Sequence, residues 1–162
     1  MELYSTRGSR IDFNMVILQN FRKEDAMLLQ AMRYPNLSVQ ETEKLIDEWN
    51  QKWVNDRYFE MFAVLVEETI VGTVSLYQQT SKVISIGPEI FRKYRQKGFG
   101  KKAMVQACRI AKEKGYKTVS QQIRTDNEAS IALHTSLGFE ANGSAYTNAK
   151  GNQVAMYVNC LV

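Results

Sequence analysis

Apolar and polar residues alternate along the chain in patterns that predict strands interspersed with amphipathic helices. Two nearly continuous apolar runs, residues 61–67 and 70–77, flank a two-residue turn, which is the pattern of a buried β-hairpin. A further strand is predicted over residues 82–91. Gly87 and Pro88 interrupt this strand, and because proline cannot donate to a sheet ladder, we expect an edge, a bulge or a local splaying there.

Helices are predicted where apolar residues recur at a spacing of three or four. Ser38 and Glu41 form a capping box, which marks the start of one of them. Its apolar stripe is predicted at Leu45, Ile46, Trp49 and Trp53. The other predicted helices start near Arg22 and end before Pro35, follow Gly98 and end at Gly115, and run from Asn127 or Asp126 to Leu137.

The remaining strands are predicted at residues 16–18, 118–123, 140–146 and 154–161. The order is therefore one strand, two helices, three strands, a helix, a strand, a helix and two strands. This order predicts a mixed α/β sheet with helices on its faces. Residues 15–162 are expected to form a single domain, and residues 1–14 a polar extension that is either disordered or an extra strand.

Composition narrows the possibilities for function. The 162 residues include 44% hydrophobic positions, which suffices for one core, and no run approaches the about 18 apolar residues of a membrane helix. No secretory signal is visible, so a cytoplasmic location is expected. Cys108 and Cys160 fit no zinc or redox spacing, and the chain has one histidine, so no metal site is expected.

Positive charge gathers around a glycine-containing segment. The net charge is only +4, yet six cations lie close together: Arg92, Lys93, Arg95, Lys97, Lys101 and Lys102. Gly98 and Gly100 lack a Cβ, so the backbone can turn sharply and approach a ligand there. The first amides of the helix that follows have no intrahelical acceptor and attract anions. The segment predicts a cradle for a polyphosphate, although a solvated basic face has the same composition.

Other phosphate-binding and nucleic-acid-binding classes fit less well. The sequence contains neither the P-loop pattern nor the Gly-x-Gly-x-x-Gly dinucleotide fingerprint. RNA binding through the basic residues remains an alternative, but no module of interleaved aromatic and basic residues stands out.

A second motif points to a family. The segment from Asn127 to Phe139 resembles the Asn-x-x-Ala-x-x-Leu-Tyr-x-x-x-Gly-Phe segment of the GNAT superfamily of N-acetyltransferases. Arg95-x-x-Gly98-x-Gly100 is similar to the acetyl-CoA motif of that superfamily, and the two motifs lie in the family's order. Residues 70–74 resemble its third strand. The resemblance covers residues 16–162 and is strongest over residues 86–139.

The resemblance implies a fold and a reaction. The fold is a mostly antiparallel sheet that splays between its fourth and fifth strands, with helices on both faces. The reaction transfers an acetyl group from acetyl-CoA to a primary amine by direct attack in a ternary complex. The acceptor is a small amine or a protein N-terminus, and the protein is a monomer or homodimer without nucleic-acid or membrane partners. A non-catalytic acyl-CoA-binding regulatory module is the alternative.

The resemblance also implies site residues. Those expected to bind the cofactor are Pro88, Glu89, Ile90, Arg95, Gln96, Lys97, Gly98, Phe99, Gly100, Lys101, Asn127 and His134. His134 stands where the family has a tyrosine that protonates the departing thiolate, so it is a candidate catalytic acid. Glu89 is the candidate general base. The structural alternatives are a half-buried histidine on an amphipathic helix and a solvated glutamate.

Overall fold

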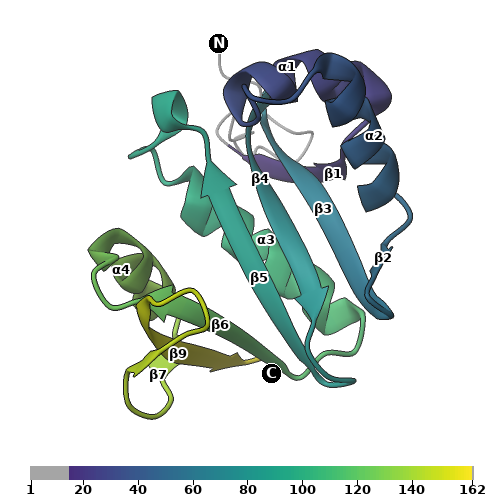
Figure 1. The fold of residues 1–162 in the computed structure, drawn as a ribbon. Helices are drawn as coiled ribbons and strands as arrows, with labels where there is room; N and C mark the ends of the chain where they lie inside the picture. Colours follow the sequence, from purple (N-terminus) through teal and green to yellow (C-terminus); the bar gives the residue numbers. More distant parts are fainter. Residues whose placement is uncertain (1–14, 162) are drawn as a thin grey trace, which may run out of the picture.

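A computed structural model describes residues 15–161, so the predicted extension at residues 1–14 lies outside the described residues. Seven strands follow one another across the sheet (Figure 1): β1 (Val16–Asn20), β3 (Arg57–Val66), β4 (Thr69–Gln78), β5 (Val83–Ile90), β6 (Thr118–Arg124), β9 (Gln153–Cys160) and β7 (Glu140–Ala141). Two short strands pair beside this series, β2 (Trp53–Val54) with β3 and β8 (Tyr146–Thr147) with β9.

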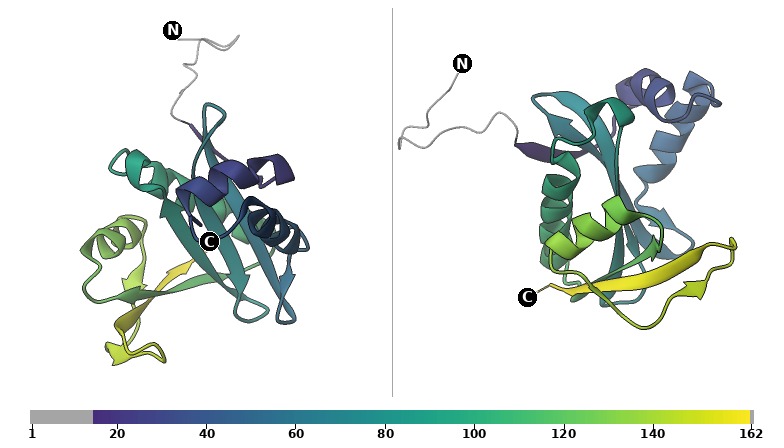
Figure 2. Two further views of the ribbon diagram at one scale, coloured as in Figure 1. Left: turned by 45° about the horizontal axis from the view of Figure 1, so that its top comes forward. Right: turned by 90° about the vertical axis from the view of Figure 1, so that its left-hand side faces the viewer.

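Helices cover both faces of the sheet, as expected. α1 (Ala26–Met32) and α2 (Val39–Trp49) lie over one face, and α3 (Phe99–Glu113) lies over the other (Figure 2). α4 (Glu128–Ser136) follows β6, and short 3₁₀ turns occupy Lys23–Asp25 and Arg92–Tyr94. Each face has its own apolar cluster. One includes Met104 of α3, and the other includes Leu29 of α1 and Ile46 of α2.

The predicted start of α2 is confirmed, but its predicted length is wrong. The Ser38 hydroxyl accepts from the Glu41 amide at 3.0 Å, and the Glu41 carboxylate accepts from the Ser38 amide at 2.7 Å. The helix ends at Trp49, so Trp53 does not continue its apolar stripe. Trp53 lies in β2 and is 58% exposed. The cause is local, because Lys52 adopts a positive φ that ends the helical path.

β5 and β6 separate soon after they meet. They run parallel, and within residues 15–161 they pair only at Val83 with Thr118 and at Ile84 with Val119. Immediately beyond, the Ser85 hydroxyl donates to the Ser120 carbonyl at 2.8 Å. Because β2 is an additional short strand, β5 and β6 are the fourth and fifth strands of the expected fold. The splay therefore occurs between the expected strands.

The splaying predicted at Gly87 and Pro88 is present on the side of β5 that faces β6, whereas a bulge against β4 is not found there. Both residues stay in register with β4, opposite Ser75 and Val74. Bonds from Gln79 N to Val83 O and from Phe91 N to Val71 O show that odd-numbered residues of β5 bond to β4. Pro88 is even-numbered, so its nitrogen faces the β6 side. The proline costs β4 no bond and removes a donor only from the edge where β6 departs.

Candidate active site

A cavity of about 670 Å³ opens where β5 and β6 diverge. Its wall comes from β5, the segment before α3, the first turn of α3, β6 and α4. The lining residues are Gly87, Pro88, Glu89, Ile90, Arg95, Gln96, Gly98, Gly100, Lys101, Gln121, Asn127, Ala129, Ser130, Leu133 and His134. Residues of the two sequence motifs, one starting at Arg95 and the other at Asn127, thus meet at one cavity. In the chain, about one helix and one strand separate the two motifs.

The structure brings the residues expected to bind the cofactor to this wall, with two exceptions. Phe99 is 7% exposed and packs into the apolar cluster beneath α3, so only its backbone can face a ligand. Lys97 is exposed but does not line the cavity. Gly98 and Gly100 line the cavity, whereas the side chain of Phe99 between them is buried in the core.

The start of α3 forms one end of the cavity. Gln96 and Gly98 both adopt positive φ values, 64° and 79°, which turn the chain sharply into the helix. No side chain of residues 15–161 caps α3, and its first turn contains no acidic residue. α2 and α4, by contrast, are capped by Ser38 and Asn127. The first amides of α3 thus face the cavity end without a side-chain acceptor, beside Lys101.

The outer edge of β5 supplies further backbone groups. Ile86 and Ile90 present their amides and carbonyls to the side that β6 has left, by the same alternation that places the nitrogen of Pro88 there. Arg95 Nε donates to the Ile90 carbonyl at 2.8 Å, which holds the guanidinium against the end of the strand. The edge resembles an unpaired strand that an extended ligand can join.

His134 reaches the cavity from α4, and a hydrogen bond selects the tautomer of its neutral ring. It is 2% exposed, and its Nδ1 lies 2.7 Å from the Ser130 carbonyl. A carbonyl only accepts, so Nδ1 carries the proton and Nε2 is a bare acceptor. Nε2 is buried and has no partner in the described part of the chain. Burial lowers the pKa of His134 below its ordinary value, against a smaller raising effect of the Ser130 carbonyl.

Gln121 is a second buried acceptor on the same wall, and the sequence did not indicate it as a site residue. Its Oε1 lacks a hydrogen-bond partner among residues 15–161. Alternation along β6 puts Gln121 on the same face as the buried Val119 and Ile123, which is the signal that could have placed it. Similarly, Ser130 lies one helical turn before His134, so helical spacing predicts that the two share a face.

Glu89 is paired. Its carboxylate lies 2.9 Å from Nε of Arg33, the residue that ends α1, and both side chains are about 40% exposed. The pair joins the α1–α2 side of the molecule to the mouth of the cavity. Sequence reasoning missed Arg33, because the two residues are 56 positions apart and no local pattern relates them.

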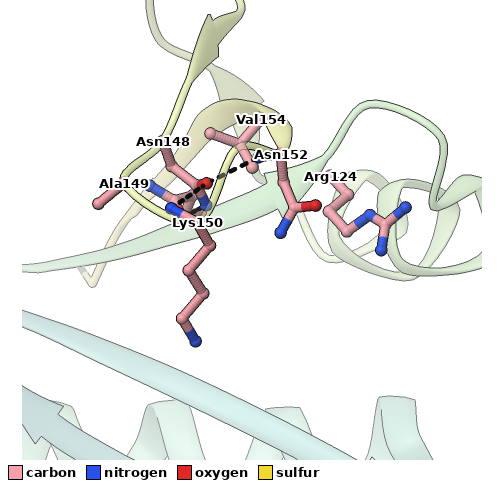
Figure 3. Close-up of a pocket in the computed structure, with 7 residues that line it drawn as sticks. Arg124, Asn148, Ala149, Lys150, Asn152 and Val154 are labelled. Atoms are coloured by element: carbon pink, nitrogen blue, oxygen red, sulfur yellow. Dashed lines mark hydrogen bonds between the residues drawn. The ribbon is translucent and has the colours of Figure 1, made fainter.

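A second cavity, of about 350 Å³, lies at the turn between β8 and β9 (Figure 3). The Asn148 side chain accepts from the amides of Lys150 and Asn152, both at 3.0 Å, and donates to Gln122 of β6 at 2.9 Å. The turn is thereby fastened to the sheet. Lys150 extends away from it, and Arg124 lies beside it, bound to Asp126 at 2.7 Å.

Neither a metal site nor a membrane span is found in the part of the chain that the structure describes. No three His, Cys, Asp or Glu side chains of residues 15–161 gather closely enough to hold a metal ion. Within the same residues, no helix is both long enough and apolar enough to cross a bilayer.

Comparison with known proteins places this geometry in context. The sequence model of the acetyltransferase (GNAT) domain matches residues 12–140. Among curated proteins, the uncharacterised N-acetyltransferase YokL, derived from the SPbeta prophage of Bacillus subtilis strain 168, is 30% identical over 99 residues. The aligned part covers 59% of this chain and 56% of YokL, so it spans about half the length of that relative.

Solved structures share the fold at low sequence identity. The microcin C7 self-immunity acetyltransferase MccE, in complex with acetyl-CoA and AMP, superimposes with a TM-score of 0.76 and 17% identity, over 91% of this chain and 93% of its own. An acetyltransferase from Salmonella typhimurium that modifies the N-terminal serine of ribosomal protein L7/L12 gives a TM-score of 0.75 at 16% identity, over 90% and 95%. The expected fold class is confirmed.

Proposed function

The chain belongs to the GNAT acetyltransferase family, and we propose that it transfers the acetyl group of acetyl-CoA to a primary amine by direct attack of the amine on the thioester. One observation carries the proposal. The cavity between β5 and β6 has an uncapped helix start at one end, an unpaired strand edge along its side and a buried imidazole on its wall. Acetyl-CoA has a part to match each of these features. Its anionic diphosphate matches the helix start, its extended pantetheine arm matches the strand edge, and its thioester matches the imidazole.

The diphosphate of acetyl-CoA is assigned to the start of α3. The backbone amides from Gln96 to Lys101 belong to the segment at this end of the cavity, and the positive end of the helix dipole adds to their attraction for an anion. Lys101 lines the same end and supplies a mobile charge. Lys97 lies outside the cavity wall, so the side-chain role assigned to it is only the attraction of its positive charge for the diphosphate.

The pantetheine arm is assigned to the edge of β5. Ile86 and Ile90 offer amides there, and Pro88 offers only its carbonyl, so the Ile90 amide is the donor that can polarise the thioester carbonyl. Asn127 uses Oδ1 to accept from the Ser130 amide at 3.1 Å, which leaves its own amide group for the arm. His134 then stands beside the sulfur end.

The acceptor amine is assigned to the mouth of the cavity. Glu89 lines the wall there and carries a negative charge that attracts an ammonium group, while its ion pair with Arg33 holds it in place. We assign it a positioning role and leave proton transfer to His134. Small amines and protein N-termini remain the two acceptor classes.

Thiol release tests the proposal. Purified protein is mixed with acetyl-CoA and a panel of small amines and peptides with unblocked N-termini, and free thiol is measured against a sample without amine. Thiol release that depends on an amine is the expected result. Stabilisation by acetyl-CoA without release for any amine would instead leave a non-catalytic acyl-CoA-binding module. Absence of both effects would contradict the family's activity for this chain.

A further inference from the structure

We infer that His134 enters the reaction as a proton acceptor: its Nε2 takes the proton from the attacking amine nitrogen and then passes it to the departing sulfur. The inference rests on the proposed function and specifies the role of one residue within it. A catalytic acid at this position would have to carry its proton before the reaction starts and donate it first. In the inferred sequence, His134 accepts a proton before it donates one.

The hydrogen bond at Nδ1 fixes the direction of transfer. The Ser130 carbonyl, 2.7 Å away, can only accept, so the single proton of a neutral imidazole stays on Nδ1. Nε2 is left with a lone pair and no proton to donate. A residue in this state accepts first and can donate only afterwards.

Within the described part of the chain, the lone pair of Nε2 is buried without a partner, in a residue that lines the cavity. His134 is 2% exposed, and its Nε2 has no partner among residues 15–161, which is a costly state for a buried polar atom. The residue lines the same cavity as Pro88 and Ile90, at the edge assigned to the thioester. Gln121 lines it too, with an equally unpartnered Oε1, and can hold the amine nitrogen without taking its proton.

The surroundings keep the imidazole neutral at the start. Phe139 contacts the ring edge-on, with centroids 5.0 Å apart, and offers no charge. The charged groups that share the cavity are Arg95 before α3, Lys101 on α3 and Glu89 on β5. Two of these are cations, which oppose protonation, and Glu89 is already paired with Arg33. Burial, which lowers the pKa of His134, acts in the same direction.

The proposed step balances without any other reagent. The amine lone pair forms the N–C bond as the carbonyl π pair moves to oxygen. The proton of the resulting ammonium nitrogen moves to Nε2. The oxyanion pair then re-forms the carbonyl, the C–S bond breaks, and the proton on Nε2 moves to sulfur. The products are the acetylated amine and the free thiol, and His134 returns to its starting state.

A first test reads the protonation state of His134 directly. His134 is the single histidine of the sequence, so its imidazole ¹⁵N resonances need no assignment in protein without a histidine tag. We expect Nδ1 protonated and Nε2 bare at pH 7, with a titration midpoint below the ordinary value of about 6.5. A proton on Nε2, or an imidazolium that persists at pH 7, would overturn the inference whether or not the protein turns over.

A second test uses the pH dependence of kcat with saturating acetyl-CoA and the best amine of the panel. For the wild type, kcat should rise with pH through the midpoint found by NMR. His134→Gln should lose about 100-fold in kcat, together with that rising limb. Its affinity for acetyl-CoA should stay within about twofold of the wild type. Thr135→Gln changes the exposed neighbouring position of α4 and serves as the matched control. It should keep the wild-type kcat and its rise with pH.

Two kinetic outcomes count against the inference alone. One is a kcat that falls as pH rises through the His134 midpoint, which indicates an acid. The other is an unchanged kcat in His134→Gln, with normal thermal unfolding of that variant. A wild-type protein that releases no thiol with any amine fails the proposed function itself, and the inference falls with it. The NMR result then still reports whether the imidazole is held as described.

Discussion

Glu60 is a buried carboxylate whose partners come from four parts of the chain. It is 4% exposed and accepts from Asn20 Nδ2 at 2.9 Å and from the Tyr58 hydroxyl. Lys52 and Lys114 place their ammonium groups 3.3 and 3.8 Å away. Burial alone would raise the pKa of Glu60, but the hydrogen bonds from Tyr58, Asn20 and Lys52 outweigh it, and the pKa lies below its ordinary value.

Replacing this carboxylate should cost stability in a defined pH range. Glu60→Gln leaves two lysines facing a neutral group, and we expect a loss of about 2–4 kcal/mol in the free energy of unfolding at pH 7. Because the folded pKa is lowered, the contribution is present above the unfolded value of about 4.3 and is lost as pH falls through the folded one. Denaturant unfolding at several pH values measures both effects.

The control for Glu60 is Glu113→Gln, which removes an exposed carboxylate near the end of α3. It should change the free energy of unfolding by less than about 0.5 kcal/mol. An equally small effect of Glu60→Gln would show that the charged network contributes nothing net.

His134 should make folding stability pH-dependent in a different window. Its folded pKa is lowered, so the unfolded chain binds the proton first as pH falls below about 6.5. The free energy of unfolding of the wild type should therefore decline below that pH and continue to decline until the folded pKa is reached. His134→Gln should lack this part of the decline. If the free energy of unfolding of the wild type and of His134→Gln declined equally as pH falls, the result would contradict a neutral buried imidazole.

Among single residues, the sequence indicated those cavity-lining positions that belong to local motifs. Gly98, Asn127 and His134 were found because each sits in a short motif with a fixed helix start or spacing. Arg33 and the partners of Glu60 were not found, since they depend on which strands and helices lie side by side. A pairing across 40 or 56 positions leaves no mark on local patterns.

Among the elements, the start of α3 is the one on which the proposed binding of acetyl-CoA depends. A Cβ at Gly100 would meet Ile90 Cγ1 at 3.6 Å and Leu133 Cδ2 at 3.8 Å, which are ordinary contacts. Gly100→Ala should therefore fold normally, with a free energy of unfolding equal to or up to about 1 kcal/mol above that of the wild type. The added methyl group faces the cavity, so affinity for acetyl-CoA should fall about tenfold.

Calorimetric titration of Gly100→Ala with acetyl-CoA gives the affinity, and denaturant unfolding gives the stability. Unchanged affinity would remove the first turn of α3 from the proposed binding site. Loss of stability as well as affinity would show that the glycine serves the fold instead.

The close approach of β4 to the end of β5 can be tested at Gly72. A Cβ there would lie 2.3 Å from the Glu89 carbonyl oxygen and 2.9 Å from Ile90 Cα, and both are backbone atoms that cannot turn aside. Gly72→Ala should displace the edge of β5, with a loss of about 1–3 kcal/mol in the free energy of unfolding and weaker binding of acetyl-CoA.

Gly87→Ala is the matched comparison for Gly72, one strand away. Its Cβ meets only the Ser75 hydroxyl oxygen at 3.0 Å, and that side chain can rotate. We expect less than half the destabilisation of Gly72→Ala. Equal losses would mean that glycine is needed at both positions for backbone flexibility rather than for space.

The order of elements was predictable because each helix and strand carries its own apolar period and end signals. The register of the strands was not predictable, and the separation of β5 from β6 shows why. Gly87 and Pro88 look like a break in a strand, yet β5 continues straight past them against β4. The proline affects only the other edge, and which edge a residue faces depends on a pairing that local sequence does not encode.

At the scale of the whole molecule, the sheet and helices together form the cavity that we propose binds acetyl-CoA. The positive charge that stood out in the sequence gathers at the start of α3, while the splay and the imidazole lie on separate elements. Acetyl-CoA at 100 times its dissociation constant should add about 2.7 kcal/mol to the free energy of unfolding. Unfolding in the presence of the ligand measures this, and the absence of any shift would contradict specific binding.

The most direct test is the crystal structure of the protein with acetyl-CoA. We predict that the diphosphate lies over the amides from Gln96 to Lys101, that the pantetheine arm runs beside β5 from Ile86 to Ile90, and that the sulfur lies next to His134. Density for the ligand at another place, or an empty cavity at saturating acetyl-CoA, would contradict the account.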